Sequence, residues 1–522
     1  MCGIFFYKGK QYNKNQLLKF LLENKHRGPD NTKYKIINDI FLGFNRLSVN
    51  GLDEISNQPF YMKGCYLICN GEIYNYKKLI KKYELETEYV SRSDCEIIIH
   101  LYKKIGFDKM IRELDGEFAF VLYDEINDYI YISRDPLGIR SLYYCIEDNQ
   151  IAVASEMKSL VKFKNVTQFP SGYYWMNNIG LIEYYKFEYK INHNITEKQV
   201  LKNIHDLLIE GVEKRLMSER KIACLLSGGL DSTLVTAIVC NKIGAKNLNT
   251  YSIGLEGSVD LEYAKKAAEY LGTNHTNIVL SEEDFLYAIE PTIKQIESWD
   301  TTSVRASVGN YLVSLYIKNN SDDTILFCGD VSDEIFASYR GFMSADTDEN
   351  LLKENTIMLK NIRYFDVLRS DKSISGAGLE ARVPYGDIKL VDFVMSLPAQ
   401  YKKFDNNHIE KYYLRKAFHG YLPDFLLWRR KEAFSDGVSS LKRSWFQIIK
   451  EHVDKKITDN EYNIKLLKYI GDEKRTPYDK ESLYYREIFD KYYKNKDNTI
   501  PYYWRHPFST ILDPSARLLN TY

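Results

Sequence analysis

Residues 227–233 read SGGLDST, and this segment is the most informative about the fold. It follows the apolar, strand-like run KIACLL (221–226) and leads into a helical pattern that extends to residue 244. Two glycines permit tight backbone turns, so successive N–H groups can converge on phosphate oxygens, and the positive end of the helix lies at the same place. Asp231 would repel phosphate on its own, and we therefore expect it to hold Mg²⁺ that pyrophosphate also binds. The stretch predicts an anion-binding turn between a strand and a helix.

This turn is not a Walker P-loop, because no lysine follows its last glycine. It resembles the pyrophosphate loop of enzymes that cleave ATP between the α- and β-phosphates. A plain glycine-rich turn is the alternative. The combination of glycines, hydroxyls and a carboxylate in a strand–helix setting argues against that alternative.

Outward from the turn, strand-like and helical patterns alternate. Strand-like runs at 221–226, 248–255 and 324–329 are each followed by a helical pattern. This alternation predicts a doubly wound parallel sheet. A long amphipathic helix is expected after Thr196, which has the residue type of an N-cap, and the last third of the chain is predicted to be mostly helical.

The N-terminal part of the chain has a different texture. Short runs rich in β-branched or aromatic residues predict strands at 66–75, 116–124 and 129–135. The last two are separated by a short polar segment, which predicts a hairpin. Helices are expected at 15–26 and 94–106. The texture changes near residue 190, so we predict two domains, 1–190 and 191–522.

Composition excludes several classes of protein. The 522 residues are 44% hydrophobic and 27% charged, which is typical of globular proteins, and the length suggests more than one domain. The formal net charge is +0, so we expect neither nucleic acid nor a membrane as a partner. No run approaches the roughly 18 apolar residues of a membrane helix, and the first residues do not read as a secretory signal, so we expect the cytosol. Eight cysteines in a chain of this length predict neither a disulfide framework nor a zinc site.

Cys2 follows the initiator Met1. Removal of Met1 would leave Cys2 with a free α-amine whose pKa is about 7.7–8.0. That amine could take the proton from the thiol of the same residue and activate it as a nucleophile. A small buried residue on a first strand is the alternative, and Cys2 alone does not decide between them.

The other motifs decide it. In the N-terminal half they are CGI (2–4), HRGPD (26–30), RLSV (46–49), NGEIYN (70–75), SDCE (93–96), GEFAF (116–120) and RDPLG (134–138). In the C-terminal half they are SGGLDS (227–232), IGLEGSVDL (253–261), LGTNH (271–275), TTSVRAS (301–307), GLEARVPYGD (378–387), EKYYLRKAF (410–418), RRKEAFSDGV (429–438) and YREIF (485–489). In this order they resemble the family of glutamine-hydrolysing asparagine synthetases over essentially the whole chain.

The resemblance implies a fold of class α/β and α+β in two domains. Residues 1–190 would form a class II glutamine amidotransferase domain, an αββα sandwich of antiparallel sheets like that of the Ntn hydrolases. Residues 191–522 would form the ATP-dependent synthetase domain, a doubly wound parallel sheet with a helical extension, like the adenine-nucleotide α-hydrolases.

For the glutaminase site, the resemblance implies that Cys2 attacks the glutamine amide. The Asn70 side chain and the Gly71 backbone N–H would form the oxyanion hole. Arg46 would hold the α-carboxylate of glutamine, where a bidentate guanidinium fits better than lysine, and Glu72 and Asp94 would hold its α-amine. The expected glutamine-binding residues are Arg46, Leu47, Ser48, Val49, Asn50, Asn70, Gly71, Glu72 and Asp94. Alternatively, Asn70-Gly71 could form a type I′ turn, and Asp94 could be a helix N-cap.

For the synthetase site, the resemblance implies a set of ATP-binding residues: Leu226, Ser227, Gly228, Gly229, Asp231, Ser232, Ile253, Cys328 and Gly329. Arg305 and Asp333 would lie near pyrophosphate and aspartate, Lys411 would be catalytic, and Asp231 and Asp333 would hold Mg²⁺. Core packing is the alternative for Leu226 and Ile253, and an exposed helix position is the alternative for Lys411.

The chain departs from the family at one catalytic position. Family members usually have Ser-Gly-Glu-Gly where this chain has Cys328-Gly329-Asp330-Val331. The glutamate that helps to form the acyl-adenylate is therefore Asp330, whose carboxylate is set back by about 1.3–1.5 Å. A shift of about 1 Å can cost on the order of a hundredfold in rate. Gly386 also replaces an apolar residue of the family's motif. We expect synthesis to be retained because the other motifs are intact.

The expected activity is synthesis of L-asparagine from L-aspartate, through β-aspartyl-AMP, with ammonia from L-glutamine and with ATP and Mg²⁺ as cofactors. Ammonia that meets bulk water becomes ammonium, so we expect a dry path between the two sites. The alternatives are an amidotransferase or a β-lactam-synthetase-like enzyme acting on another carboxylate, and a catalytically weakened regulatory homologue. A homodimer is one open expectation for the assembly.

Overall fold

The structure is a computed structural model that describes residues 1–147, 150–405, 408–431, 434–440 and 442–515. The chain divides into two compact units. Unit 1 comprises Met1–Phe187, Met217–Lys221 and Ile374–Glu380, and unit 2 comprises Glu188–Leu216, Ile222–Ser373 and Ala381–Tyr522.

Unit 1 contains two antiparallel sheets of six strands each. The first has the order β10 (Thr167–Gln168), β8 (Tyr143–Glu147), β9 (Gln150–Ala154), β1 (Gly3–Lys8), β3 (Ile40–Arg46) and β2 (Asn31–Ile37). The second has the order β12 (Gly180–Glu183), β11 (Tyr173–Met176), β7 (Tyr129–Arg134), β6 (Gly116–Asp124), β5 (Cys65–Ile73) and β4 (Phe60–Met62). The predicted hairpin is confirmed as the antiparallel pair β6–β7.

The alternation of side chains along β5 explains how the layers stack. Tyr66 and Ile68 lie in a core shared with β1 and β3, whereas Leu67 and Cys69 lie in a second core shared with α3 (Ile97–Ile105). Successive residues of a strand point to opposite faces, so β5 belongs to a sheet that is covered by the other sheet on one face and by helices on the other.

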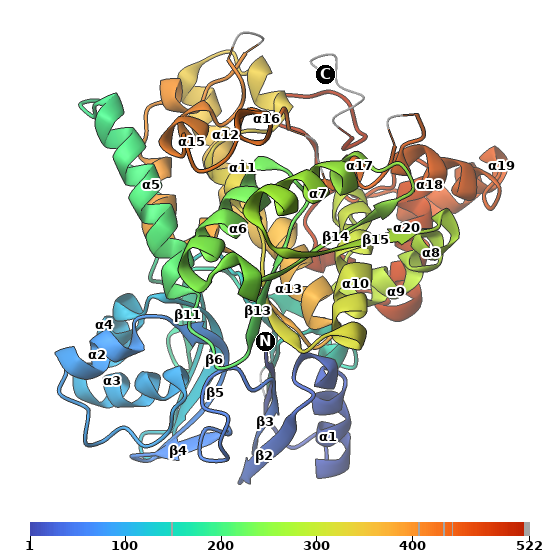
Figure 1. Cartoon of the computed structure of the whole chain (residues 1–522). Coiled ribbons are helices and arrows are strands. Elements are labelled where there is room, and N and C mark those ends of the chain that lie inside the picture. Colours follow the sequence, from blue (N-terminus) through green and yellow to red (C-terminus); the bar gives the residue numbers. More distant parts are fainter. Residues whose placement is uncertain (148–149, 406–407, 432–433, 441, 516–522) are drawn as a thin grey trace. The chain divides into compact units, whose positions relative to one another are not determined.

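The helices of unit 1 complete a four-layer arrangement (Figure 1). α1 (Lys14–Leu22) packs on β1 and β3, and α3 and α4 (Phe107–Glu113) supply residues to the second core, with α2 (Tyr76–Lys82) beside α3. The predicted αββα sandwich is confirmed.

Unit 2 is built on a five-stranded sheet. Its order is β15 (Asn274–Leu280), β14 (Asn249–Leu255), β13 (Lys221–Leu225), β16 (Asp323–Phe327) and β17 (Glu380–Arg382). β13 pairs with β14, and β14 with β15, in parallel. The strand order reverses beside β13, because the chain moves outward to β15 and then returns to β16 on the other side. Ligands of open α/β sheets bind at the carboxyl ends of the strands at such a reversal.

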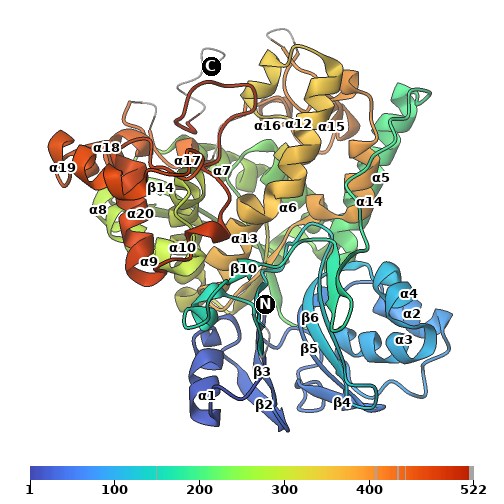
Figure 2. The same cartoon turned by 180° about the vertical axis from the view of Figure 1, so that it is seen from behind.

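Helices surround this sheet and extend beyond it. Those that pack on it include α6 (Leu230–Ile243), α7 (Val259–Leu271) and α10 (Thr301–Asn320). The remaining helices are α5 (Glu197–Lys214), α8 (Glu282–Tyr287), α9 (Ile289–Ile296), α11 (Ser332–Ile335), α12 (Asp348–Asn361), α13 (Asp366–Ser375), α14 (Ile388–Met395), α15 (Tyr412–Ala417), α16 (Asp424–Leu427), α17 (Phe434–Gly437), α18 (Trp445–Asp454), α19 (Asp459–Leu466) and α20 (Lys480–Tyr492). α8, α9, α18 and α20 gather in one group in both views (Figures 1 and 2). The predicted parallel sheet with a helical extension is confirmed.

Three local features bear on the sequence interpretation. Thr196 caps α5 in a capping box with Gln199, as predicted from its residue type. Asn70-Gly71 lies inside β5 and not in a turn, which rules out the type I′ alternative. The cap before residues 94–96 is Ser93, so the N-cap alternative for Asp94 is wrong as well. Among the described residues, no helix combines the length and apolar character needed to cross a bilayer.

Candidate active sites

The Cys2 site of unit 1 is formed where β1 begins beside β5. The Cys2 nitrogen donates a hydrogen bond to Asn70 Oδ1 at 2.8 Å, and Cys2 Sγ lies 3.6 Å from the carbonyl oxygen of Leu47. The structure therefore brings together the predicted nucleophile, the predicted oxyanion-hole residue and the start of the predicted glutamine-binding segment.

In the form that retains Met1, this thiol is not activated. Met1 is buried, and its ammonium group forms an ion pair with Glu380 at 3.0 Å. Burial raises the pKa of the Cys2 thiol to about 11, against the smaller opposing effect of the positive N-terminus. A thiol with this pKa is a poor nucleophile at neutral pH. The predicted activation therefore still depends on the free amine that removal of Met1 would create at Cys2.

The Asn70 amide is oriented by its neighbour. Its Oδ1 accepts the hydrogen bond from Cys2, whereas its fully buried Nδ2 has no hydrogen-bond partner in the described part of the chain. A buried donor without a partner is costly unless a ligand supplies an acceptor. Gly71 lies so close to β6 that a Cβ would come within 2.3 Å of the Glu117 carbonyl oxygen. The residue types at both positions are therefore constrained.

The predicted glutamine-binding residues lie on three segments: 46–50, 70–72 and the turn that contains Asp94. Glu72 Oε2 accepts a hydrogen bond from the Asn50 side chain, and Asp94 Oδ2 accepts one from the Ile73 nitrogen at 2.6 Å. Ser48 donates its backbone N–H to Asp30, and Leu47 and Val49 are buried. These contacts place the 46–50 segment beside the end of β5.

Arg46 has a structural task in this site. Its guanidinium donates to the carbonyl oxygens of Asp53 at 2.9 Å and Asn50 at 3.2 Å, to that of Gly51, and to the Asn57 side chain at 2.8 Å. These bonds hold the 50–57 loop against β3. Its predicted contact with the glutamine carboxylate stays a prediction.

Unit 2 contains a cavity of about 220 Å³. It lies at the carboxyl ends of β13 and β16, beside the reversal of strand order. Most of the predicted ATP-binding residues line it: Leu226, Ser227, Gly229, Asp231, Ser232, Ile253, Cys328 and Gly329. Asp330, Asp333 and Lys411 line it too. Leu226 and Ile253 are also buried, so each packs in the core and faces the cavity.

The turn after β13 needs its glycines for close packing. Gly228 has φ +71°, and a Cβ on it would lie 2.4 Å from the backbone of Tyr263. It is not among the cavity-lining residues, so it shapes the turn from behind. Gly329 lies against the other side, where a Cβ would come within 2.8 Å of the Ser232 nitrogen. The two loops thus meet backbone to backbone over the N-terminus of α6.

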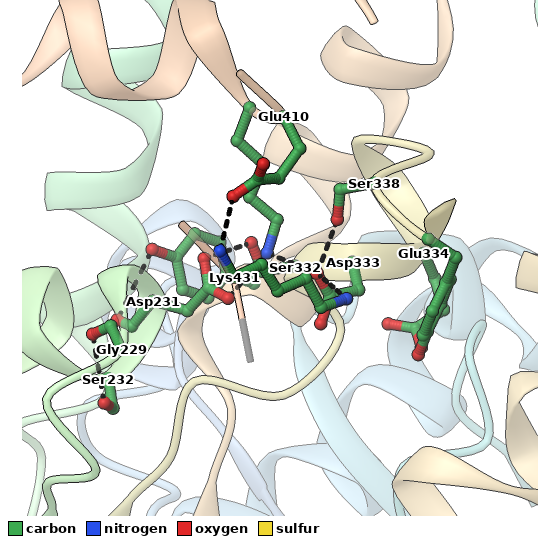
Figure 3. A network of polar contacts seen from close by, with 12 residues as sticks. Gly229, Asp231, Ser232, Ser332, Asp333, Glu334, Ser338, Glu410 and Lys431 are labelled. Atoms are coloured by element: carbon green, nitrogen blue, oxygen red, sulfur yellow. Dashed lines mark hydrogen bonds and ion pairs between the residues drawn. The ribbon is translucent and has the colours of Figure 1, made fainter. Parts of the chain in front are cut away.

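Two carboxylates and two lysines converge in the cavity, and Figure 3 shows Asp231, Asp333 and Lys431 among them. Lys411 Nζ lies 2.5 Å from both Asp231 Oδ2 and Asp333 Oδ1, and Lys431 Nζ lies 2.7 Å from Asp333 Oδ1. Burial alone would raise the pKa of the Asp333 carboxyl, but Lys411 and Lys431 hold that pKa well below its ordinary value. Asp333 is therefore ionised. A phosphate that displaced the carboxylates from Lys411 and Lys431 would take over the charges of these lysines.

This cluster can accommodate Mg²⁺. No group of three or more His, Cys, Asp or Glu side chains suited to a metal occurs among the described residues. Nucleotide-bound Mg²⁺ usually takes only one or two carboxylates and completes its shell with phosphate oxygens and water. Asp231 and Asp333 offer such a pair.

Sequence reasoning missed several residues of this cavity. Lys431, Glu334, Tyr339, Asp366 and Arg369 all line it. Burial, and then the nearby Asp366 and Asp333 carboxylates, raise the pKa of Glu334, and the Tyr339 hydroxyl donates to Glu334 Oε1 at 2.5 Å. The run RRK at 429–431 is a visible signal for Lys431. Nothing in the sequence indicates that α13 packs against the loop after β16.

Arg305 does not line the cavity, contrary to its predicted place beside pyrophosphate and aspartate. Its guanidinium is buried and forms ion pairs with Glu481 at 2.7 Å and with Asp513 at 2.8 Å. It faces the C-terminal helices from α10, whereas Thr302, Ser303 and Ala306 of the same helix face the cavity.

Comparison with known proteins covers the whole chain. A glutamine amidotransferase domain model matches residues 1–217, and an asparagine synthase model matches residues 203–355 and 344–517. A probable glutamine-hydrolysing asparagine synthetase of Acanthamoeba polyphaga mimivirus is 38% identical, over 99% of this chain and 100% of the relative. The glutamine-hydrolysing asparagine synthetases of Gallus gallus and Homo sapiens are each 36% identical, over 100% of this chain and 99% of the relative. With both domains and the full length matched, the chain belongs to the family of glutamine-hydrolysing asparagine synthetases.

Proposed function

We propose that the chain synthesises L-asparagine from L-aspartate, using ammonia released from L-glutamine and energy from ATP. The observation that carries the proposal is the cavity of unit 2. The turn at 227–233 supplies Asp231 and the segment after β16 supplies Asp333, and Lys411 pairs with both carboxylates while Lys431 pairs with Asp333. An ATP triphosphate with Mg²⁺ requires such a mixture of carboxylates and lysines.

In the glutaminase half, Cys2 would attack the side-chain amide of glutamine once Met1 is removed. The Asn70 Nδ2 group would then donate to the oxyanion, which gives its buried N–H a partner. Glu72 and Asp94 would hold the α-ammonium group, and Arg46 would hold the α-carboxylate.

In the synthetase half, aspartate would attack the α-phosphate of ATP and displace pyrophosphate. Asp231 and Asp333 would hold Mg²⁺ together with phosphate oxygens, and the ion would neutralise charge on the leaving pyrophosphate. Lys411 and Lys431 would move from the carboxylates to the phosphates. Asp330 and Arg369 line the same cavity and offer charges that match the amine and carboxylate of aspartate.

Three finer points belong to the same proposal. Ammonia must reach the acyl-adenylate without meeting bulk water, since ammonium has no nucleophilic lone pair. We propose the cytosol as the compartment. A homodimer, and the absence of a nucleic-acid partner, stay predictions.

The test is a product assay with ATP, Mg²⁺, aspartate and glutamine. We expect asparagine, AMP, pyrophosphate and glutamate, and we expect ammonium chloride to replace glutamine. A folded, ATP-binding protein that releases no pyrophosphate with aspartate and ammonium chloride contradicts the proposal. Pyrophosphate release with a different carboxylic acid but not with aspartate would instead reassign the acceptor.

A further inference from the structure

Asp330 occupies the position at which this chain departs from its family, and both of its carboxylate oxygens are engaged. Arg369 donates to Oδ1 at 2.6 Å, and the Ser370 hydroxyl donates to Oδ2 at 2.6 Å. Arg369 and Ser370 are consecutive residues of α13. The Asp330 side chain keeps 17% of its surface exposed within the cavity, so the carboxylate is held from behind while it faces the substrate space.

Ser370 bonds a side chain outside its helix, whereas a helical serine commonly bonds only a backbone carbonyl of the preceding turn. A hydroxyl has one hydrogen to donate, and Ser370 Oγ has two acceptors in reach: Asp330 Oδ2 at 2.6 Å and the Asp366 carbonyl oxygen at 3.0 Å. The shorter bond to an ionised acceptor is the stronger one. Ser373, on the same helix, shows the ordinary case, because its hydroxyl donates to the Arg369 carbonyl oxygen four residues earlier.

We propose that Ser370 is a positioning residue that fixes the Asp330 carboxylate for acyl-adenylate formation and fits this site to aspartate at position 330 rather than the longer glutamate. The inference rests on the proposed function. Ser370 acts through Asp330 and takes no part in the bond changes: the aspartate carboxylate oxygen bonds to the α-phosphorus, and the bond to pyrophosphate breaks.

The fit to aspartate follows from the distances. Glutamate would extend the carboxylate by about 1.3–1.5 Å. From a starting separation of 2.6 Å, an extension toward Ser370 would bring the oxygens far inside hydrogen-bonding distance. A glutamate at 330 must therefore bend away from its reactive position or displace Ser370. Removing the Ser370 hydroxyl opens the space that the longer side chain needs, so the two positions are coupled.

A double-mutant cycle tests this coupling. The four proteins are wild type, Ser370→Ala, Asp330→Glu and the double variant Asp330→Glu/Ser370→Ala. The matched control is Ser373→Ala, a buried serine of the same helix with only a backbone acceptor. Pyrophosphate release is measured with ATP, Mg²⁺, aspartate and ammonium chloride, giving kcat and the KM for ATP, and glutaminase activity reports on the integrity of the rest of the chain.

We expect Ser370→Ala to lower kcat by about tenfold or more with the KM for ATP unchanged, since misplacement of a catalytic group acts on the rate of the chemical step. Ser373→Ala should stay within about twofold of wild type. Asp330→Glu should also have a lowered kcat. The kcat of the double variant should be at least about tenfold higher than the value obtained by multiplying the two single losses.

Two results overturn the inference. One is a Ser370→Ala protein that matches Ser373→Ala in kcat. The other is a double variant whose loss of kcat equals the product of the losses in the two single variants. Failure of the proposed function looks different, because the wild-type chain itself would then release no pyrophosphate with aspartate.

Discussion

The main-chain nitrogen of Cys2 donates a hydrogen bond to Asn70 Oδ1 at 2.8 Å. This bond fixes which end of the Asn70 amide faces the nucleophile's backbone. It leaves Nδ2 buried and without a partner among the described residues, which is the arrangement that a developing oxyanion requires.

Replacing Asn70 should therefore cost catalysis more than binding. We expect Asn70→Ala to lower kcat for glutamine hydrolysis by roughly 10²–10³-fold, the effect of losing one oxyanion donor. Asn127→Ala is a suitable control, because Asn127 caps an exposed turn between β6 and β7 through Asp124. Glutamate release measured against glutamine concentration checks this, and a change confined to KM would assign Asn70 to ground-state binding instead.

Loss of the thiol should separate the two activities. In Cys2→Ala, glutamine-dependent asparagine synthesis should vanish, because no thioester can form. Synthesis from ammonium chloride should persist, because none of the described residues that line the cavity of unit 2 belongs to unit 1. Asparagine formation is measured with each nitrogen source in turn. If both activities disappear from a folded variant, the two sites are not separable.

Lys411 should be essential for adenylation. Its ammonium group pairs with both Asp231 and Asp333, whereas Lys431 pairs with Asp333. We expect Lys411→Gln to reduce aspartate-dependent pyrophosphate release by about a hundredfold or more. Lys416→Gln, on the short helix α15 that begins just after Lys411 but paired at the surface with Glu197, should leave the rate unchanged. Equal rates for the two variants would exclude Lys411 from the chemistry.

The architecture could be predicted from the sequence, and so could the membership of most motif residues in the cavity of unit 2. Alternating runs predicted the parallel sheet, and the glycines of the 227–233 turn predicted a backbone-lined site, because both depend on local pattern. The sequence was not sufficient for contacts between distant segments. Asp330 meets Arg369 and Ser370 only because α13 packs against the loop after β16, and no periodicity carries that information. The same limit explains Arg305, which faces away from the cavity on a helix that is buried almost all round.

Arg305 should accordingly behave as a structural residue. Arg305→Gln leaves Glu481 and Asp513 without their buried cation, which typically costs on the order of 3–5 kcal/mol. Arg443 also pairs with two carboxylates, Glu282 and Glu451, but at the surface, so Arg443→Gln should shift the denaturation midpoint only slightly. Urea unfolding and the KM for ATP are measured for both. A raised KM in a stable Arg305→Gln protein would return Arg305 to the substrate site.

The buried Lys402 should make stability depend on pH. Its ammonium nitrogen lies in the core, where it donates to Asn355 Oδ1 at 2.8 Å and contacts the Met395 sulfur at 3.5 Å. Burial lowers the pKa of Lys402 from 10.5 to about 7. Between these values the unfolded chain binds a proton that the folded chain releases, so the free energy of unfolding rises with pH across this range.

The contribution of Lys402 should amount to roughly 1 kcal/mol per pH unit above pH 7.5. Lys402→Met removes the titrating group and should flatten the rise in unfolding free energy between pH 7.5 and 9. Lys403→Met, which removes the neighbouring surface lysine paired with Asp348, should keep the wild-type slope. Urea denaturation at several pH values gives the three slopes. Parallel curves for wild type and Lys402→Met would mean that Lys402 stays protonated in the folded chain and that its contact with Asn355 compensates for the burial of its charge.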